Sequence, residues 1–440
     1  MQKRDILWWM ILYLLICNTL VTLNINIAIV SMVNYSNSVN ENENTSVPCP
    51  NTTFYWGENE GLNNTKLQTE DIYNWNSYEQ NKLLFGYYWF SWLAILLGAV
   101  LAQKFGSKIV LGYSQITSSL MSSLIPVLAH NGAEIITYIR AAQGTLSMIA
   151  IPGAMLTIIG NWSPLPERGK FASVLLIGST AGFGVGSMVF GYIGEYYHWK
   201  YIFHLTSVCG LIWAILWYFL IYDTPEEHPT ITKNEVEYIS NSLKNSEEND
   251  KVTIPWKAIL TSYPFILSSL ALIACGWNFC LLSTYTPSYL KSIYGLNTNQ
   301  IGIINSIPQY ISGIGAYGLG FLSDSIVNKG LLSITNSRKL FTFLGCIGSS
   351  IPLIVLAYTK CDVIRVTICI ILITFLRNLN VFGVELVLID ISPKFCGLLQ
   401  GISGISGSLI YFIPAMSINY LSIDTPVEEL WKIIFYLQQK

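Results

Sequence analysis

The stretch TYIRAAQGTLSMIAIP, residues 137–152, is apolar or small except at Arg140 and Gln143. It lies inside a longer apolar segment, residues 133–159, which can cross a bilayer because a spanning helix needs about 20 predominantly apolar residues. A charge at that depth costs at least about 2.5 kcal/mol, so it normally faces a wet cavity or a partner. The segment therefore predicts a membrane protein with a polar interior.

The composition of the whole chain supports this prediction. Of its 440 residues, 52% are hydrophobic and 11% are charged, whereas soluble proteins carry about 25% charged residues. The net charge of −2 leaves no basic footprint for nucleic acid, and no cysteine spacing resembles a metal site. We expect an all-α, polytopic protein embedded in the lipid bilayer, without a resident cofactor and monomeric.

Apolar segments of spanning length recur along the chain. Eleven are predicted, near 7–33, 83–102, 108–130, 133–159, 171–194, 200–222, 262–289, 300–323, 339–358, 363–389 and 397–421. A twelfth begins at Trp431 and is too short to span, so we expect either that the chain ends there or that this is a truncated or alternative product. The polar stretch 223–255 separates six spans from the rest, so we expect an N-terminal bundle (1–222), a cytoplasmic linker (223–261) and a C-terminal bundle (262–440).

Charge and glycosylation patterns predict the orientation. Lysine and arginine are more frequent in the loops that become cytoplasmic if the N-terminus lies inside. The first long outer loop holds four glycosylation acceptor patterns, at Asn34, Asn44, Asn51 and Asn63. Cys49 and Cys361 both fall on the outer side, which is compatible with a disulfide between them and also with two free thiols.

Several motifs, in this order and at these spacings, resemble the anion:cation symporter branch of the major facilitator superfamily. They are NINIAIVSMV (24–33), RAAQG (140–144), WSPLPERGK (162–170), YDTPEEHPTIT (222–232), IPWKAILTS (254–262) and LIDISPKFCGLLQGIS (388–403). The branch includes sialin-like and phosphate cotransporter-like proteins. The resemblance implies a major facilitator fold of two six-helix bundles, with helices one, four, seven and ten around a central cavity.

The same resemblance implies a function. The branch moves small organic or inorganic anions of the phosphate or carboxylate class by alternating access, driven by H⁺, Na⁺ or membrane voltage. It implies an integral multi-pass protein of the plasma membrane or of an endolysosomal or vesicular membrane. The chain departs from the branch at Thr22 and Ser147, where an arginine and a glutamate are usual, and at Val387 and Leu388, where asparagine and histidine are usual.

Arg140 matches the helix-four arginine of the branch. We expect it to hold the substrate anion, with Gln143 one turn later adding a hydrogen bond. The alternative is a structural arginine that snorkels outward or bonds backbone carbonyls. Tyr87 and Trp277 are aromatic candidates to flank the substrate, although packing is the commoner role of such residues.

Arg377 is a second candidate cation, near the middle of predicted helix ten. It lies eleven residues before Leu388, which at 100° per residue returns to within about 20° of the same helix face. Because Thr22 replaces the helix-one arginine, we hypothesise that the second positive charge of the cavity moved to Arg377. The alternative is that Arg377 pairs with Glu385, eight residues further along.

The remaining charges divide between coupling and gating. Glu385 is the acid in the body of helix ten and a candidate for ion coupling, because burial raises the pKa of a carboxylate. A gate or loop contact is the alternative role for it, and a helix cap or charge latch is expected for Asp390. The expected gating-loop charges are Asp324, Arg338, Lys339, Lys104, Lys108, Glu167 and Arg168.

The sequence therefore predicts a secondary active transporter, a symporter of small anions. The alternative is a degenerate member of the family that no longer transports and acts as a receptor, scaffold or regulator. An enzyme is not expected, because His130, His198, His204 and His228 are scattered toward helix ends or loops.

Overall fold

The computed structural model describes residues 2–33, 49, 72–164, 167–244, 256–359, 361–391, 396–409, 411–421 and 427–437. These residues form helices, with one isolated bridge between Val33 and Tyr73 as their only strand-like pairing. The expected glycosylation sites Asn34, Asn44, Asn51 and Asn63 lie outside the described residues and stay predictions.

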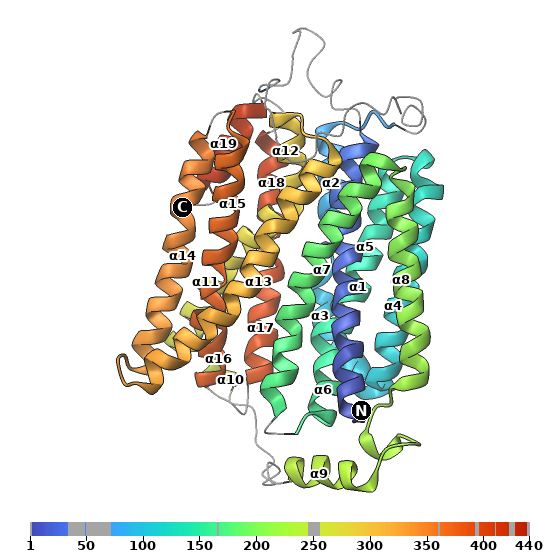
Figure 1. Ribbon diagram of the computed structural model, residues 1–440, viewed down its shortest axis with the longest axis vertical. Helices are drawn as coiled ribbons and strands as arrows, with labels where there is room; N and C mark the ends of the chain where they lie inside the picture. Colours follow the sequence, from blue (N-terminus) through green and yellow to red (C-terminus); the bar gives the residue numbers. More distant parts are fainter. Residues whose placement is uncertain are drawn as a thin grey trace.

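The helices before residue 222 form the N-terminal bundle, drawn in blue to green in Figure 1. They are α1 (Lys3–Met32), α2 (Ser77–Gly86), α3 (Ser91–Phe105), α4 (Ser107–Leu128), α5 (Ala133–Ile149), η2 (Ala150–Met155), α6 (Leu156–Trp162), α7 (Arg168–Tyr196) and α8 (Lys200–Leu220), with the short η1 (Ala129–Asn131) between α4 and α5.

The helices after residue 262 form the C-terminal bundle, drawn in yellow to red beside the first (Figure 1). They are α11 (Tyr263–Cys280), η5 (Leu281–Tyr285), α12 (Thr286–Tyr294), α13 (Thr298–Asn328), α14 (Ile334–Tyr358), α15 (Val363–Arg377), η6 (Val381–Glu385), α16 (Leu386–Ile391), α17 (Cys396–Leu409), α18 (Phe412–Leu421) and α19 (Val427–Leu437). Between the bundles lie η4 (Pro225–Glu227), α9 (Lys233–Lys244) and α10 (Trp256–Leu260).

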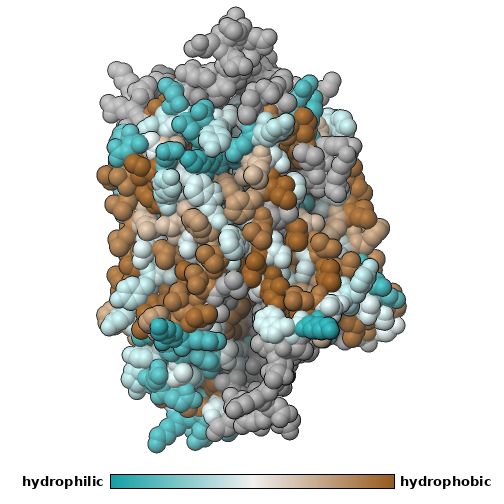
Figure 2. All heavy atoms as spheres, turned by 180° about the vertical axis from the view of Figure 1, so that it is seen from behind, coloured by the Kyte–Doolittle hydropathy of each residue, from teal (hydrophilic) through white to brown (hydrophobic). Residues whose placement is uncertain are grey.

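Length and hydropathy place this fold in a membrane. Within the described residues, six helical segments are long and apolar enough to cross a bilayer: Lys3–Met32, Ser173–Tyr196, Lys200–Leu220, Tyr263–Tyr294, Ile334–Tyr358 and Val363–Leu388. Figure 2 shows hydrophobic side chains gathered around the middle of the molecule and hydrophilic ones toward its two ends. An aqueous surface would not tolerate such a band, whereas lipid tails do.

The apolar core differs between the two ends of the molecule. We call the end that holds α12 the outer end, and the end that holds the N-terminus and α9 the inner end (Figure 1). The backbone amide of Cys49 donates to the carbonyl oxygen of Ile293 in α12, so Cys49 lies at the outer end. At the outer end one cluster joins both bundles and contains Phe85 and Ile136 as well as Tyr285 and Phe435. At the inner end two clusters stay separate, one around Ile11, Trp162 and Trp213 and one of Ile259, Phe265, Leu388 and Leu399. The apolar core of the described residues is therefore continuous across the two bundles at the outer end and divided between them at the inner end.

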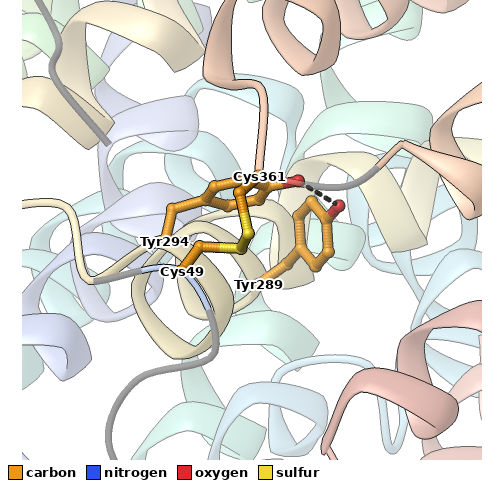
Figure 3. The surroundings of a disulfide bond; sticks show 4 residues. All are labelled: Cys49, Tyr289, Tyr294 and Cys361. Carbon is orange, nitrogen blue, oxygen red and sulfur yellow. Dashed lines mark hydrogen bonds between the residues drawn. A yellow bond between two sulfur atoms is a disulfide. The ribbon is translucent and has the colours of Figure 1, made fainter. Parts of the chain in front are cut away.

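A disulfide joins Cys49 to Cys361 at the outer end, which confirms one of the two readings of these cysteines. Figure 3 shows it beside Tyr289 and Tyr294, whose hydroxyls lie 3.4 Å apart. Cys49 follows α1 in the chain, whereas Cys361 connects α14 to α15, so the bond ties the N-terminal half covalently to the C-terminal bundle.

The linker is docked on the inner end of the N-terminal bundle. The carboxylate of Glu235 in α9 accepts hydrogen bonds from the backbone amides of Lys3 and Arg4, at 3.3 and 3.2 Å. These amides belong to the first turn of α1, which has no helical acceptors for them. Ile239 is buried in the N-terminal core, and Arg4 stacks on Tyr238. α9 is therefore held on the N-terminal bundle, whereas Ile259 of α10 packs in the inner cluster of the C-terminal bundle.

The disulfide generates a stability prediction. Replacement of Cys361 by serine is expected to destabilise the protein by about 2–4 kcal/mol, because the cross-link restricts the unfolded chain. Thermal unfolding in detergent, with and without reductant, measures this effect. Reductant should lower the midpoint of the wild type and leave that of Cys361→Ser unchanged. Cys209→Ser, which removes a free thiol, should behave like the wild type. An equal reductant shift in Cys361→Ser would contradict the assignment.

Candidate functional site

Arg140 lies inside the N-terminal bundle, with 1% of its surface exposed. Its Nη1 donates to the carbonyl oxygen of Val21 at 2.6 Å and to Asn24 Oδ1 at 3.2 Å, and its Nη2 donates to the carbonyl oxygen of Thr22 at 3.1 Å. Among the described residues no carboxylate pairs with it. A buried guanidinium without a counter-ion needs such acceptors, so α1 and α5 are held together by this side chain.

Gln143 and Tyr87 complete the surroundings of Arg140. Gln143 Oε1 accepts from Arg140, while its Nε2 donates to the carbonyl oxygen of Ser118 and to Ser122 Oγ in α4. The guanidinium carbon of Arg140 lies 4.8 Å from the centre of the Tyr87 ring, a cation–π contact. Arg140, Gln143 and Tyr87 therefore form one polar cluster. We expected all three to contact the substrate, but in this conformation none of them is exposed to solvent.

Neutral side chains occupy the two positions where the expected charges are missing. Thr22 Oγ donates to the carbonyl oxygen of Asn18 and lies 3.1 Å from the hydroxyl of Tyr87. Ser147 Oγ donates to Asn18 Oδ1. α1, the segment after α2 and α5 are therefore joined by uncharged hydrogen bonds, and Arg140 is the charged group of this interior.

Arg377 is in a different situation. It ends α15, and its guanidinium carbon lies 4.8 Å from the centre of the Phe279 ring in α11. Its side chain is partly exposed, and within the described chain it makes no hydrogen bond and no ion pair. Cys275 and Tyr411 lie within electrostatic range of it. Arg377 is therefore a cation in the membrane-spanning part whose donors are available to a ligand.

Glu385 lies near Arg377 without bonding it. It ends the π-helical turn η6, its side chain is exposed, and the field of Arg377 acts on it. No ion pair within 4.0 Å joins the two in the described structure, and the alternative of an Arg377–Glu385 pair bridged by water stays a hypothesis. The predicted second cation and the predicted coupling acid are instead brought into one region, each free to bind a partner.

Trp277 lies in α11, two residues before Phe279. Its indole is partly buried against the outer core cluster, and its Nε1 donor has no partner among the described residues. The aromatic ring in contact with Arg377 is that of Phe279, which sequence reasoning did not single out. A signal was available, because residues 275–279 place a thiol and two aromatic rings on one turn of a predicted spanning helix.

Gating charges pair within their own bundle at the inner end. Arg338 bonds Asp390 at 2.8 Å and the carbonyl oxygen of Phe382 at 3.1 Å, while Glu167 pairs with Arg4 at 3.0 Å. In the part of the chain that the structure describes, no ion pair at this end joins the two bundles. This agrees with the two separate apolar clusters at the inner end.

The other expected gating charges are less engaged. The backbone amide of Lys108 donates to Asp223, and its ammonium lies 4.0 Å from the centre of the Tyr222 ring. Lys104 and Lys339 are exposed. The side chains of Asp324 and Arg168 lie outside the described part, although their backbones belong to α13 and α7.

Three π-helical turns interrupt the helices of the candidate site. They are η2 after α5, η5 after α11 and η6 after α15, in the fourth, seventh and tenth spans. A π turn inserts an extra residue into the helix and is frequent at functional sites, because it changes the direction of the following side chains. Glu385 stands at the end of one such turn. The turns coincide with three of the four helices expected to line the cavity.

The sequence profile of the Major Facilitator Superfamily matches residues 11–417 of the chain. Human sialin is 28% identical over 94% of this chain and 82% of its own length. Mouse sodium-dependent phosphate transport protein 3 is 27% identical over 94% of the chain and 86% of its own length. Vesicular glutamate transporter 1 of Xenopus laevis is 26% identical, covering 94% and 68% respectively.

Solved structures agree on the fold. A bacterial homologue of the human lysosomal transporter Spinster superposes with a TM-score of 0.67 and 12% identity, covering 95% of this chain and 83% of its own. A D-xylose–proton symporter superposes with a TM-score of 0.64 and 14% identity, covering 99% and 95%.

The contrast between the two arginines generates a prediction. Arg140→Lys should destabilise the ligand-free protein by about 3 kcal/mol, because an ammonium cannot reach all the acceptors of the buried guanidinium. Arg377→Lys should change stability by less than about 1 kcal/mol, since Arg377 makes no protein hydrogen bond. Thermal unfolding without any added anion measures both. Equal stability of the two variants would contradict the structural role of Arg140.

Proposed function

The chain belongs to the Major Facilitator Superfamily, and from this membership we propose that it is a secondary active transporter that carries small anions by alternating access. In this mechanism the substrate path runs between the N-terminal and the C-terminal bundle. Because the apolar core crosses between the bundles at the outer end and is divided at the inner end, the proposal takes the described conformation as the one in which substrate exchanges with the inner side.

The observation that carries the proposal is the unpaired, accessible guanidinium of Arg377. A cation in a membrane interior is costly unless something neutralises it, and a guanidinium binds carboxylate or phosphate oxygens through two parallel hydrogen bonds. The contact with the Phe279 ring, 4.8 Å from the guanidinium carbon, occupies none of the N–H donors in a conventional hydrogen bond, so they remain for an anion. Arg377 thus takes the role of the helix-one arginine that Thr22 replaces.

Arg140 then has a supporting role in this state. Its donors are engaged by α1, so direct contact with the substrate would require their release during the transport cycle. We propose that Arg140, Gln143 and Tyr87 form the N-terminal wall of the path, and that Trp277 borders it on the other side. The anion is of the phosphate or carboxylate class, in keeping with the names of the sialin, phosphate and glutamate transporters that resemble the chain.

Glu385 is the proposed coupling residue. An ionised carboxylate near Arg377 competes with the substrate anion for the positive field. A proton taken up by Glu385, or a Na⁺ bound to it, removes this competition, so that anion and cation bind together. Under this coupling, the protein changes conformation readily when it holds both the anion and the cation, and when it holds neither.

The second candidate is a family member that binds an anion without carrying it across. The neutral residues Thr22 and Ser147 favour it, because the usual charges of the branch are absent at both positions. The protein would then act as a receptor or scaffold.

We also propose that the N-terminus is cytoplasmic, and that the protein resides in the plasma membrane or in an endolysosomal or vesicular membrane.

Uptake into proteoliposomes tests these proposals. Labelled phosphate, glutamate, sialate and urate would be offered while proton, sodium and voltage gradients are imposed separately. Arg377→Gln should reduce uptake by about tenfold to a hundredfold, the loss of a charged hydrogen bond of about 1.5–3 kcal/mol. Glu385→Gln should abolish the dependence on the coupling gradient, because an amide does not take up a proton.

Arg365→Gln is the matched control, because Arg365 lies on the same helix, α15, and is exposed in a pair with Asp362. Such surface pairs contribute little, so uptake should stay at the wild-type level. Unchanged uptake in the charge reversal Arg377→Glu would refute the role of Arg377. Binding of an anion by folded protein, without uptake under any gradient, would favour the receptor or scaffold.

A further inference from the structure

Asn81 connects the two bundles at the outer end. It lies in α2, with 3% of its surface exposed. Its Nδ2 donates to the carbonyl oxygen of Ala415 at 2.7 Å and to Asn419 Oδ1 at 2.6 Å, both in α18. Its Oδ1 accepts from the hydroxyl of Tyr285 at the end of η5. One side chain of the N-terminal bundle thus makes three hydrogen bonds to two helical segments of the C-terminal bundle.

The partners dictate the orientation of this amide. The carbonyl oxygen of Ala415 can only accept a hydrogen bond, so the nitrogen of Asn81 must face it. The oxygen of Asn81 then faces Tyr285, whose hydroxyl donates. Asparagine is the side chain of this size that offers two donors and an acceptor on one planar group. Neither aspartate nor leucine can replace it without leaving a buried polar group unpaired.

Aromatic contacts keep water away from these bonds. Phe85 and Phe412 pack with ring centres 4.8 Å apart, and Tyr88 and Tyr411 with centres 4.5 Å apart, each pair crossing from one bundle to the other. Tyr285 and Ala415 belong to the same buried cluster. Hydrogen bonds in such surroundings are not weakened by competing water, and their loss leaves unpaired groups until water enters.

We propose that Asn81 is the residue that holds the outer gate closed, and that its three bonds break each time the outer end opens. The inference rests on the proposed alternating-access transport, in which the outer ends must separate. Other polar contacts between the bundles at this end include Asn26 Nδ2 to the carbonyl oxygen of Ser283 at 3.3 Å, and two bonds of Thr298, to Glu195 and to Ser31. Asn81 combines three, and its partners Tyr285 and Ala415 belong to the apolar cluster that joins the bundles.

The disulfide does not replace this gate. The disulfide joins Cys49 to Cys361, neither of which belongs to α2 or α18, whereas the bonds of Asn81 join these two helices directly. The non-covalent bonds of Asn81 set the closed position.

Labelling of Cys280 from the outer side tests the proposal. Cys280 is a free thiol, 1% exposed, at the end of α11 directly before η5. A membrane-impermeant thiol reagent would be added outside right-side-out proteoliposomes, and mass spectrometry of peptides would give the labelling rate of Cys280. Asn81→Asp keeps the shape but sets a carboxylate oxygen against Ala415 and Asn419, so the rate should rise about tenfold. Tyr285→Phe should give a smaller rise.

Gln80→Ala is the matched control. Gln80 is the neighbouring buried amide, but its hydrogen bond goes to the carbonyl oxygen of Trp75 within the N-terminal half. Its loss should leave the labelling rate unchanged. A wild-type rate in both Asn81→Asp and Tyr285→Phe, with intact thermal unfolding, would overturn the proposal. If Asn81→Asp does not fold, Tyr285→Phe alone decides.

The readout separates this inference from the proposed function, because labelling of Cys280 requires no transported anion. Faster labelling in a protein that transports nothing would support the gate and count against the transporter. Anion uptake combined with unchanged labelling in the variants would support the transporter and refute the gate.

Discussion

A positive charge buried in an apolar helix bundle must find acceptors, and Arg140 finds them on the backbone of α1. The carbonyl oxygens of Val21 and Thr22 each accept a hydrogen bond from its guanidinium, which also makes a cation–π contact with the Tyr87 ring. These acceptors neutralise the charge without a carboxylate, so the N-terminal interior needs no acid. The position of α1 against α5, and with it one wall of the proposed path, depends on this interaction.

The same chemistry has the opposite consequence at Arg377. This guanidinium has a ring beneath it and an acid in its field, but no hydrogen-bond acceptor in the described structure. The protein therefore bonds both terminal nitrogens of Arg140, although its buried Nε has no partner among the described residues, whereas the donors of Arg377 are left for a ligand. A transporter needs both kinds, because a carrier whose cations were all satisfied internally would bind no anion, whereas one whose cations were all free would lose its packing.

The two ends of the molecule complement each other in the bonds they make. Outer contacts cross between the bundles through Asn81, aromatic pairs and a disulfide, whereas inner ion pairs such as Arg338–Asp390 stay within one bundle. Closure of the inner end would have to form new contacts while the outer ones break. Because these contacts are few and discrete, the bundles can alternate between two packings and need no continuous deformation.

Local chemistry determined much of this protein. The spanning segments, the family, and the two arginines and the acid within those segments are readable from hydropathy and motif order. The disulfide could only be proposed, because sidedness does not measure distance. Tertiary packing alone decided which arginine is satisfied, since Arg140 and Val21 stand 119 positions apart in the chain. It also selected Asn81, whose partner Asn419 is 338 positions away. A side chain carries its charge in the sequence, but only the fold supplies its partner.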